Sequence, residues 1–236
     1  MNFEYPTLEG KIVKRYKRFF ADIELDSGEI VTAHTPNTGS MKTCWEPGWK
    51  AFISHNDNPK RKLKYTLEMT HNGKSWIGVN TSRPNHIAKE AIEKGVVEEL
   101  QGYQSIKPEH KVGNSRIDLL LYDGELKSPE KCCYVEIKNV TLKGEGTLAL
   151  FPDAVSERGQ KHLKELIDLV EKGHEAAMLF IVQREDVDSF SPAHEIDPKY
   201  GSLLRQAYDK GVKVLAYRCA LSKENITLKD KLTIKL

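Results

Sequence analysis

The feature that most constrains the fold is an abrupt change of pattern near residue 82. Before it, the chain consists of short β-prone runs separated by turn-forming residues. The runs are GKIVKRYKRFFADIEL, EIVTAHT, WKAFISH, YTLEMTH and SWIGVN. Five short strands of this kind fit a small closed β-barrel, for which the five-stranded oligonucleotide-binding (OB) barrel is one candidate. A compact sandwich has the same periodicity and stays open as the alternative.

After TSRPNH (81–86) the chain alternates between helical and strand-like patterns. Helical periodicity covers residues 84–103, 151–173 and 197–211, and near-continuous apolar runs cover 176–184 and 213–221. Apolar runs of this type are typical of strands that are buried on both faces. We therefore predict two domains: an OB-like nucleic-acid-binding barrel over 1–82, and an α/β domain over 83–236 with a mixed sheet flanked by helices.

Composition narrows the class of protein. Of the 236 residues, 39% are hydrophobic and 30% are charged, which is typical of a globular protein with a real core. No apolar run is long enough to span a bilayer, and the N-terminus lacks a signal segment, so we expect a cytoplasmic protein without a membrane partner. The four cysteines have no C-x-x-C spacing, which argues against zinc or redox chemistry.

The basic residues of the first domain form two clusters. The formal net charge is only +2, but local clusters set the field that a polyanion meets. Aromatic side chains at Tyr16, Phe19 and Phe20 accompany the first cluster, a combination that favours nucleic acid. A solvated lysine-rich surface is the alternative. The predicted DNA-backbone contacts in the clusters are Lys14, Arg15, Lys17, Arg18, Lys60, Arg61 and Lys62.

Two apolar runs of the second domain carry charge where a buried strand should have none. In RIDLLL, Asp118 lies on the face opposite Ile117, and in YVEIKN, Glu136 and Lys138 share one face. If these strands pair, two carboxylates and an ammonium converge. Such a group suits phosphodiester cleavage with Mg²⁺ or Mn²⁺ held by Asp118 and Glu136, and with Lys138 orienting water or offsetting phosphate charge. A structural ion-pair cluster is the alternative.

The predicted helices add further candidates. Glu90 and Glu98 lie near one face of the helix over 84–103, and we favour Glu90 as a third carboxylate of the site. In the second helix, Arg158 and His162 share a side and are predicted to contact phosphate. Gly159 lowers helix stability by roughly 1 kcal/mol relative to Ala, which indicates a close backbone approach there.

One loop remains ambiguous. HTPNTGSM (34–41) is polar and lies between strand-like runs, so it is predicted to connect them. Its side chains could also bind a backbone phosphate.

Seven motifs, in order, resemble the sugar fermentation stimulation protein A family. They are AHTPNTGSM, NPKRKLKYTLE, IGVNTSRPN, SRIDLLL, YVEIKNVTL, FPDAVSERGQKHLKEL and IDPKY, and the match runs from end to end. The resemblance implies an OB-like barrel, a PD-(D/E)xK nuclease-like domain, DNA binding without marked sequence preference, and a connection with maltose utilisation genes. In that pattern Asp118 matches the first acidic position, Glu136 and Lys138 match E-x-K, and Glu90 matches the helix acid.

Three functions remain open at this point. The first is a cytoplasmic DNA-binding protein with a Mg²⁺- or Mn²⁺-dependent nuclease-like site. The second is a non-catalytic DNA-binding regulatory factor that uses the same fold as a scaffold. The third, a remoter one, is an enzyme acting on a small phosphorylated ligand. The oligomeric state is open, a homodimer being one option.

Overall fold

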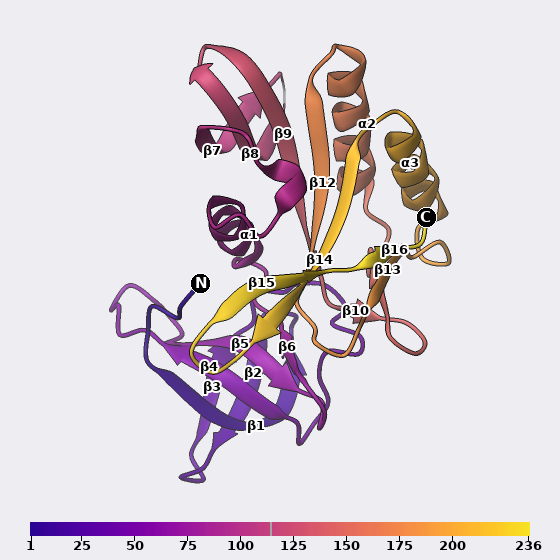
Figure 1. Ribbon diagram of the computed structural model, residues 1–236. Coiled ribbons are helices and arrows are strands. Elements are labelled where there is room, and N and C mark those ends of the chain that lie inside the picture. Colours follow the sequence, from indigo (N-terminus) through magenta and orange to yellow (C-terminus); the bar gives the residue numbers. More distant parts are fainter. Residues whose placement is uncertain (114) are drawn as a thin grey trace.

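The computed structural model describes residues 1–113 and 115–236, and Figure 1 shows its two parts stacked one on the other. The N-terminal part is built of strands alone. Its strands are β1 (Thr7–Tyr16), β2 (Phe20–Leu25), β3 (Ile30–His34), β4 (Lys50–His55), β5 (Tyr65–His71) and β6 (Trp76–Gly78).

The first five strands close into a barrel. Their hydrogen-bonded order is β3-β2-β1-β4-β5, and β3 also pairs with β5 in parallel, so neither end of the row is left free. The predicted five-stranded barrel is therefore confirmed, and the sandwich is wrong. Alternate apolar residues of these strands, such as Ala21 and Ile23 on β2, fill the interior.

The C-terminal part is a mixed six-stranded sheet with helices on both faces. The strand order is β15-β14-β12-β9-β8-β7, in which β9, β12 and β14 are parallel and the other pairs antiparallel. The elements are α1 (Pro84–Glu93), η1 (Glu98–Leu100), β7 (Ser105–Val112), β8 (Ser115–Glu125), β9 (Ser128–Val140), α2 (Glu157–Glu171), β12 (Glu175–Val182), α3 (Pro198–Asp209), β14 (Lys213–Leu221) and β15 (Ile226–Lys231).

Four shorter strands form a separate small sheet beside the barrel end of the domain. They are β10 (Leu142–Lys143), β11 (Leu148–Phe151), β13 (Ser189–Pro192) and β16 (Thr233–Ile234), in the order β10-β11-β13-β16. Figure 1 shows β10, β13 and β16 at the level where the large sheet meets the barrel. This sheet thus thickens the junction between the two parts.

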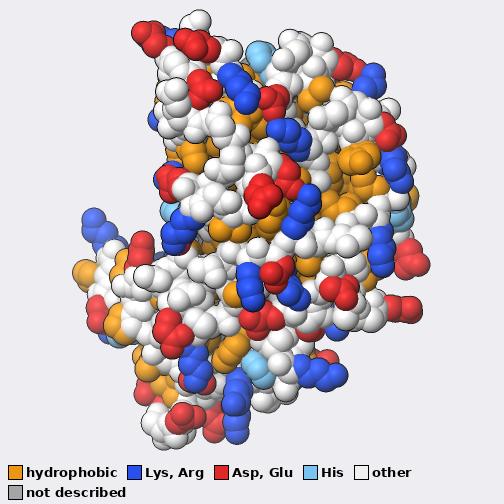
Figure 2. Space-filling model, viewed as in Figure 1, with side chains coloured by type: hydrophobic (Ala, Val, Ile, Leu, Met, Phe, Trp, Pro, Cys, Tyr) orange, Lys and Arg blue, Asp and Glu red, His pale blue; other side chains and the backbone are white. Residues whose placement is uncertain are grey.

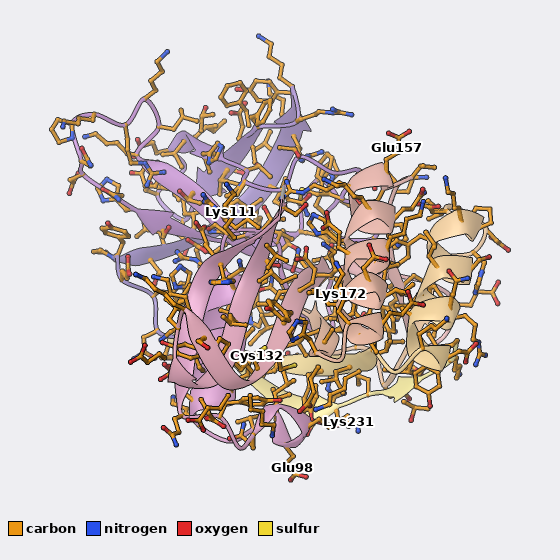
Figure 3. The ribbon with its side chains drawn as sticks, turned by 90° about the horizontal axis from the view of Figure 1, so that it is seen from above. Glu98, Lys111, Cys132, Glu157, Lys172 and Lys231 are labelled. Carbon is orange, nitrogen blue, oxygen red and sulfur yellow. The ribbon has the colours of Figure 1, made fainter. Side chains whose placement is uncertain are left out.

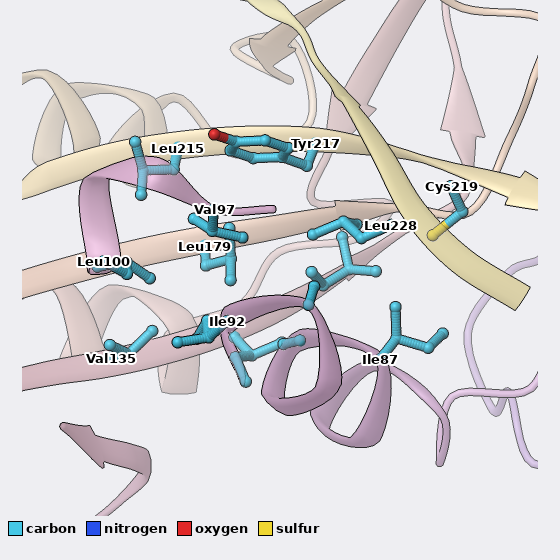
Figure 4. Close-up of a cluster of buried hydrophobic side chains, with 14 of the residues drawn as sticks. Ile87, Ile92, Val97, Leu100, Val135, Leu179, Leu215, Tyr217, Cys219 and Leu228 are labelled. Atoms are coloured by element: carbon cyan, nitrogen blue, oxygen red, sulfur yellow. The ribbon is translucent and has the colours of Figure 1, made fainter. Parts of the chain in front are cut away.

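Helix α1 covers one face of the large sheet, and α2 and α3 cover the other. In Figure 4, Ile92 of α1 lies near Val135 of β9 and Leu179 of β12, and Ile87 of α1 belongs to the same buried cluster. The residues of α2 and α3 belong to a second buried cluster on the opposite face, together with Phe180. Both faces of β9 and β12 are therefore buried, as their apolar runs indicate.

Helix α1 is shorter than predicted, because it ends at Glu93 and not near Gly102. Gly95 has φ +76°, a left-handed conformation that glycine adopts without steric cost. Its N–H donates to the carbonyl of Ile92 at 3.0 Å, and the N–H of Val96 donates to the carbonyl of Ala91 at 2.9 Å. This is a Schellman stop. The apolar residues beyond it are still buried, which explains why the helical periodicity continued in the sequence.

A buried arginine ties the barrel to the C-terminal part. Arg184 is 2% exposed, and its guanidinium donates to the carbonyls of Thr43 (2.8 Å) and Thr141 (2.9 Å). One carbonyl belongs to the barrel and the other to the C-terminal domain. Next to it, the N–H of Gly78 donates to the carbonyl of Gln183 at 2.9 Å. These contacts of Gln183 and Arg184 are called the clasp below.

Two further features concern membrane-spanning helices and the cysteines. No helix in residues 1–113 and 115–236 is long and apolar enough to cross a membrane. The four cysteines are buried free thiols. Burial raises the pKa of Cys133 to about 12, so this thiol stays protonated at neutral pH.

Candidate active site

Asp118 lies where β8 and β9 separate. The pairing of the two strands begins at Leu119 and Val135, so the residue before Leu119 has left the ladder. Its side chain replaces the missing strand contact, since Oδ2 accepts a hydrogen bond from the N–H of Ile137 at 2.8 Å. Oδ1 accepts from Asn85 Nδ2, in the first turn of α1, at 2.9 Å. Two elements therefore fix this carboxylate.

Glu136 is buried in the sheet, with 2% of its surface exposed. Its Oε1 accepts from Lys138 Nζ at 2.6 Å and contacts Nδ1 of His162 on α2. Burial opposes ionisation, but the hydrogen bonds and charges of His162 and Lys138 outweigh it and lower the pKa of Glu136. Its Oε2 is also buried and has no hydrogen-bond partner among the described residues.

The two carboxylates interact with each other. Burial and the nearby charge of Glu136 raise the pKa of Asp118, and the hydrogen bonds from Ile137 and Asn85 compensate only in part. A buried, unpartnered carboxylate oxygen costs free energy unless something else binds it. Two carboxylates facing one space suit a hard divalent cation whose other ligands are water and phosphate oxygens. Within residues 1–113 and 115–236, no group of three His, Cys, Asp or Glu side chains is arranged as ligands.

Three basic side chains surround Glu136. Lys138 Nζ lies 3.3 Å from His162 Nδ1, and Arg158 Nε donates to His162 Nε2 at 3.4 Å. Nδ1 of His162 contacts the Glu136 carboxylate, and Arg158 reaches that carboxylate only through the imidazole. The four-residue spacing of Arg158 and His162 along α2 places both side chains on one side of the helix, and of the two it is His162 that contacts Glu136.

Gly159 is explained by helix packing. A Cβ at this position would lie 3.0 Å from Cε2 of Tyr200 on α3, closer than most real Cβ contacts. The predicted close approach is real, and the approaching group is a buried tyrosine ring.

The structure does not bring Glu90 to the cluster. Its carboxylate pairs with Lys94 and, at 2.7 Å, with the amino group of Met1. Five residues along an α-helix rotate the side chain by about 140° from Asn85, which is the residue of α1 that contacts Asp118. An uncharged amide therefore stands where a helix carboxylate was predicted.

Glu98 is no closer. It belongs to η1, and Figure 3 shows it projecting outward at the end of the domain opposite Glu157, the first residue of α2. Sequence reasoning missed Asn85. The available signal was its position directly after Pro84, which marks the first turn of the helix, and it is this turn that contacts Asp118.

A shallow hollow of about 370 Å³ is lined by residues of the second basic cluster and by the aromatic residues that follow the first. We call it the barrel hollow. It is lined by Phe19, Phe20, His34, Arg61, Lys62 and Leu63. Phe19 is 45% exposed, which is unusual for a large apolar side chain. Lys17 and Arg18 precede it in a tight turn with φ +48° and +65°. The turn thus holds an aromatic ring in solvent beside cations.

The remaining barrel cations differ in their environment. Arg15 is partly buried and donates to the carbonyls of Asn37 and Gly39 at 2.9 and 3.2 Å, so it supports a loop. Lys14 pairs with Asp22 at 3.4 Å, while Lys60 is exposed. On the face shown in Figure 2, Lys and Arg side chains are interspersed with Asp and Glu, so no single-sign patch covers that face.

Comparisons with known proteins cover the whole chain. Residues 82–225 match the family described as "Sugar fermentation stimulation protein RE domain", and residues 13–79 match "SfsA N-terminal OB domain". A sugar fermentation stimulation protein homolog of Geotalea uraniireducens is 53% identical, with 100% of both chains covered. The homolog of Geotalea daltonii is 53% identical, with 98% of both chains covered. Among solved structures, Pyrococcus furiosus SfsA in complex with Ca²⁺ aligns with a TM-score of 0.85 and 30% identity, over 100% of this chain and 98% of that one.

Proposed function

Because the chain belongs to the sugar fermentation stimulation protein family, we propose that it binds DNA and that its C-terminal domain carries a Mg²⁺- or Mn²⁺-dependent phosphodiesterase site. The observation that carries this proposal is the buried Glu136 Oε2, which lacks a partner among the described residues and belongs to a carboxylate whose charge acts on Asp118. A buried carboxylate oxygen without a partner is an atom that a bound cation would satisfy.

Asp118 and Glu136 would hold the cation. When bound, the ion would stabilise the negative charge that develops on the phosphate. The Ca²⁺ complex of the Pyrococcus furiosus relative supports a divalent-cation site in this fold. Asp118 would stay in place without the ion, because the N–H of Ile137 and the amide of Asn85 already fix it.

The basic residues would act on the phosphate and the water. Lys138 is held by Glu136 and His162, so its ammonium would orient an attacking water or offset phosphate charge from a fixed position. Arg158 uses Nε on His162 and has no other partner in the described part of the chain, which leaves its terminal nitrogens for phosphate oxygens.

The barrel would supply DNA affinity. Arg61 and Lys62 of the barrel hollow, with exposed Lys17, Arg18 and Lys60, would contact backbone phosphates, and such contacts carry no sequence preference. A cytoplasmic location, and a part in the control of sugar-utilisation genes as the family name suggests, belong to the same proposal.

Cleavage is tested with an isosteric variant. Wild type and Asp118→Asn are incubated with single-stranded and duplex DNA in Mg²⁺, Mn²⁺ or EDTA. We expect nicking by the wild type in Mg²⁺ or Mn²⁺ only, a loss of at least a hundredfold in Asp118→Asn, and full activity in the control Glu90→Gln. Equal nicking by wild type and Asp118→Asn, or none by either, would refute the enzymatic part.

A second function is favoured by one observation. Asn85 stands where a helix carboxylate was predicted, so the site has one acidic ligand fewer than expected. A non-catalytic DNA-binding regulatory factor would retain DNA in EDTA and lose it steeply with salt. Retention in EDTA together with absent nicking would favour this function.

A further inference from the structure

A cavity of about 350 Å³ lies between the barrel and the C-terminal domain. Its walls come from the loop that follows β3, from the C-terminal end of β9 with β10, and from β11. It begins at Asn139, the residue after Lys138 on β9, whose Cα is about 3.8 Å from that of the lysine. The cavity therefore adjoins the strand that carries Glu136 and Lys138. Its volume is at the lower end of the range for small-ligand pockets.

The walls are unsuited to a phosphate. None of the lining residues is a lysine or an arginine, and the charged one is Asp153. Its Oδ2 accepts from the backbone N–H of Ser40 at 3.2 Å, which holds the loop after β3 against the cavity. A Cβ on Gly39 would lie 2.5 Å from that same oxygen, so the loop can approach only because glycine stands there. A carboxylate without a cation beside it in the wall repels an anion.

Two amides offer hydrogen bonds to an uncharged ligand. Asn37 Oδ1 accepts from the N–H of Gly39 at 2.9 Å, and Asn139 Oδ1 accepts from Gln183 Nε2 at 2.6 Å. Both amide oxygens are thus engaged, while neither amide nitrogen has a partner within the described residues. The cavity therefore presents two fixed donors, which match a ligand with carbonyl oxygens or ring nitrogens.

Part of the cavity lining is apolar. This part consists of Leu142, Leu150 and the partly exposed ring of Phe151. This ring is fixed by Tyr200, with the ring centroids 5.2 Å apart, and by Phe180 at 5.6 Å. A flat ligand with polar edges fits a space that has an aromatic and aliphatic side and amide donors.

We propose that this cavity binds one nucleobase of the DNA strand whose adjacent phosphate reaches Glu136 and Lys138. The proposal rests on the proposed function and names the strand element that the site would hold. The base would leave its stack, contact Phe151, and accept hydrogen bonds from Asn37 and Asn139. Enzymes that bind an extruded base combine the same two interactions. The base would thereby set the register of the strand at the candidate site.

Photo-crosslinking tests the position of the base without requiring cleavage. A short oligonucleotide with 5-iodouracil at every thymine position is bound in Ca²⁺ and in EDTA, irradiated, and digested with the protein for mass spectrometry. We expect an adduct in the peptide containing Phe151. In the double variant Asn37→Ala/Asn139→Ala this adduct should fall at least fivefold, because alanine removes the two amide donors without adding charge. Adducts on the barrel peptide containing Phe19 should persist and serve as the control.

Competition distinguishes a base from other occupants. An abasic oligonucleotide of equal length should suppress the Phe151 adduct at least tenfold less effectively than an intact one. Adducts on the barrel alone, or equal suppression by the abasic strand, would overturn the base pocket while leaving DNA binding intact. Absence of any DNA retention by the wild type would overturn the proposed function as well, so the two failures are distinguishable.

Discussion

Replacing Asp118 by asparagine should stabilise the protein while it abolishes the candidate activity. Burial and the charge of Glu136 raise the pKa of Asp118 above its ordinary value, so the folded protein disfavours this carboxylate. Because the folded pKa exceeds the unfolded one, the ionised group subtracts stability above the folded pKa. The penalty vanishes as the pH falls below the unfolded pKa.

The size of the effect follows from what the substitution leaves in place. Asparagine keeps an acceptor oxygen for the N–H of Ile137, and the amide of Asn85 can present its oxygen to the new NH₂ group. Only the charge is lost. We expect stabilisation of about 1 kcal/mol at pH 7, the usual size for relieving strain at a functional site, or a Tm higher by about 2–4 °C.

Thermal unfolding followed by circular dichroism measures this difference at pH 7 and towards pH 4, in EDTA. The gain in Tm should shrink on acidification. Addition of Mn²⁺ should raise the Tm of the wild type and leave the variant unchanged, because an ion that binds only the folded state stabilises it. Glu90→Gln is the control, and it should lower the Tm at pH 7. Lys94 and the amino group of Met1 lower the pKa of the Glu90 carboxylate, so its ionised form stabilises the folded protein. A lower Tm for Asp118→Asn at pH 7, or a gain independent of pH, would show that its hydrogen bonds outweigh its charge.

Three further predictions concern packing, a buried ion pair and DNA. Gly159→Ala adds a Cβ 3.0 Å from a ring atom of α3, so overpacking of about 1–3 kcal/mol should exceed the roughly 1 kcal/mol gain in helix propensity, as urea unfolding would measure. Arg83→Met leaves the fully buried Glu68 without its cation (2.7 Å), which should destabilise by about 3–5 kcal/mol; adding Glu68→Gln should restore part of this, and no restoration would contradict the reasoning. Arg61→Ala or Lys62→Ala should weaken DNA binding equally for all sequences and reduce the slope of log K against log salt by about 1 in fluorescence anisotropy, whereas a sequence-dependent loss would indicate base reading.

The sequence was most informative where one residue type determines local geometry. Turn signals and β-prone runs predicted the barrel, and the alternation of apolar residues placed Val135 and Ile137 in the core with Glu136 on the other face. The runs predicted a closed barrel but not which strands close it, because no local pattern encodes the β3–β5 pairing. The small sheet of β10, β11, β13 and β16 was missed for the same reason, since its strands have two to four residues.

The candidate site was predicted less completely than the fold. Asp118 and Glu136 were proposed because charge in an apolar strand requires a partner, and their role in the site stays a prediction. Glu90 was misplaced because periodicity gives the face that a helix buries but not which turn reaches a neighbouring strand end. Asn85 carries no charge and so gave no signal, although it is the residue of α1 that contacts Asp118.

The clasp has a consequence for which ligands can reach both halves of the protein. We expect a buried guanidinium that bonds to carbonyls on either side of the junction to oppose a hinge motion between the two parts. A DNA strand that contacts the barrel hollow and Asp118 at the same time would then have to bend between them. Supple, unpaired stretches bend at little energetic expense, whereas a stiff double helix resists curvature over a few nanometres. A rigid junction at Arg184 would thus favour the binding of single-stranded DNA over duplex DNA.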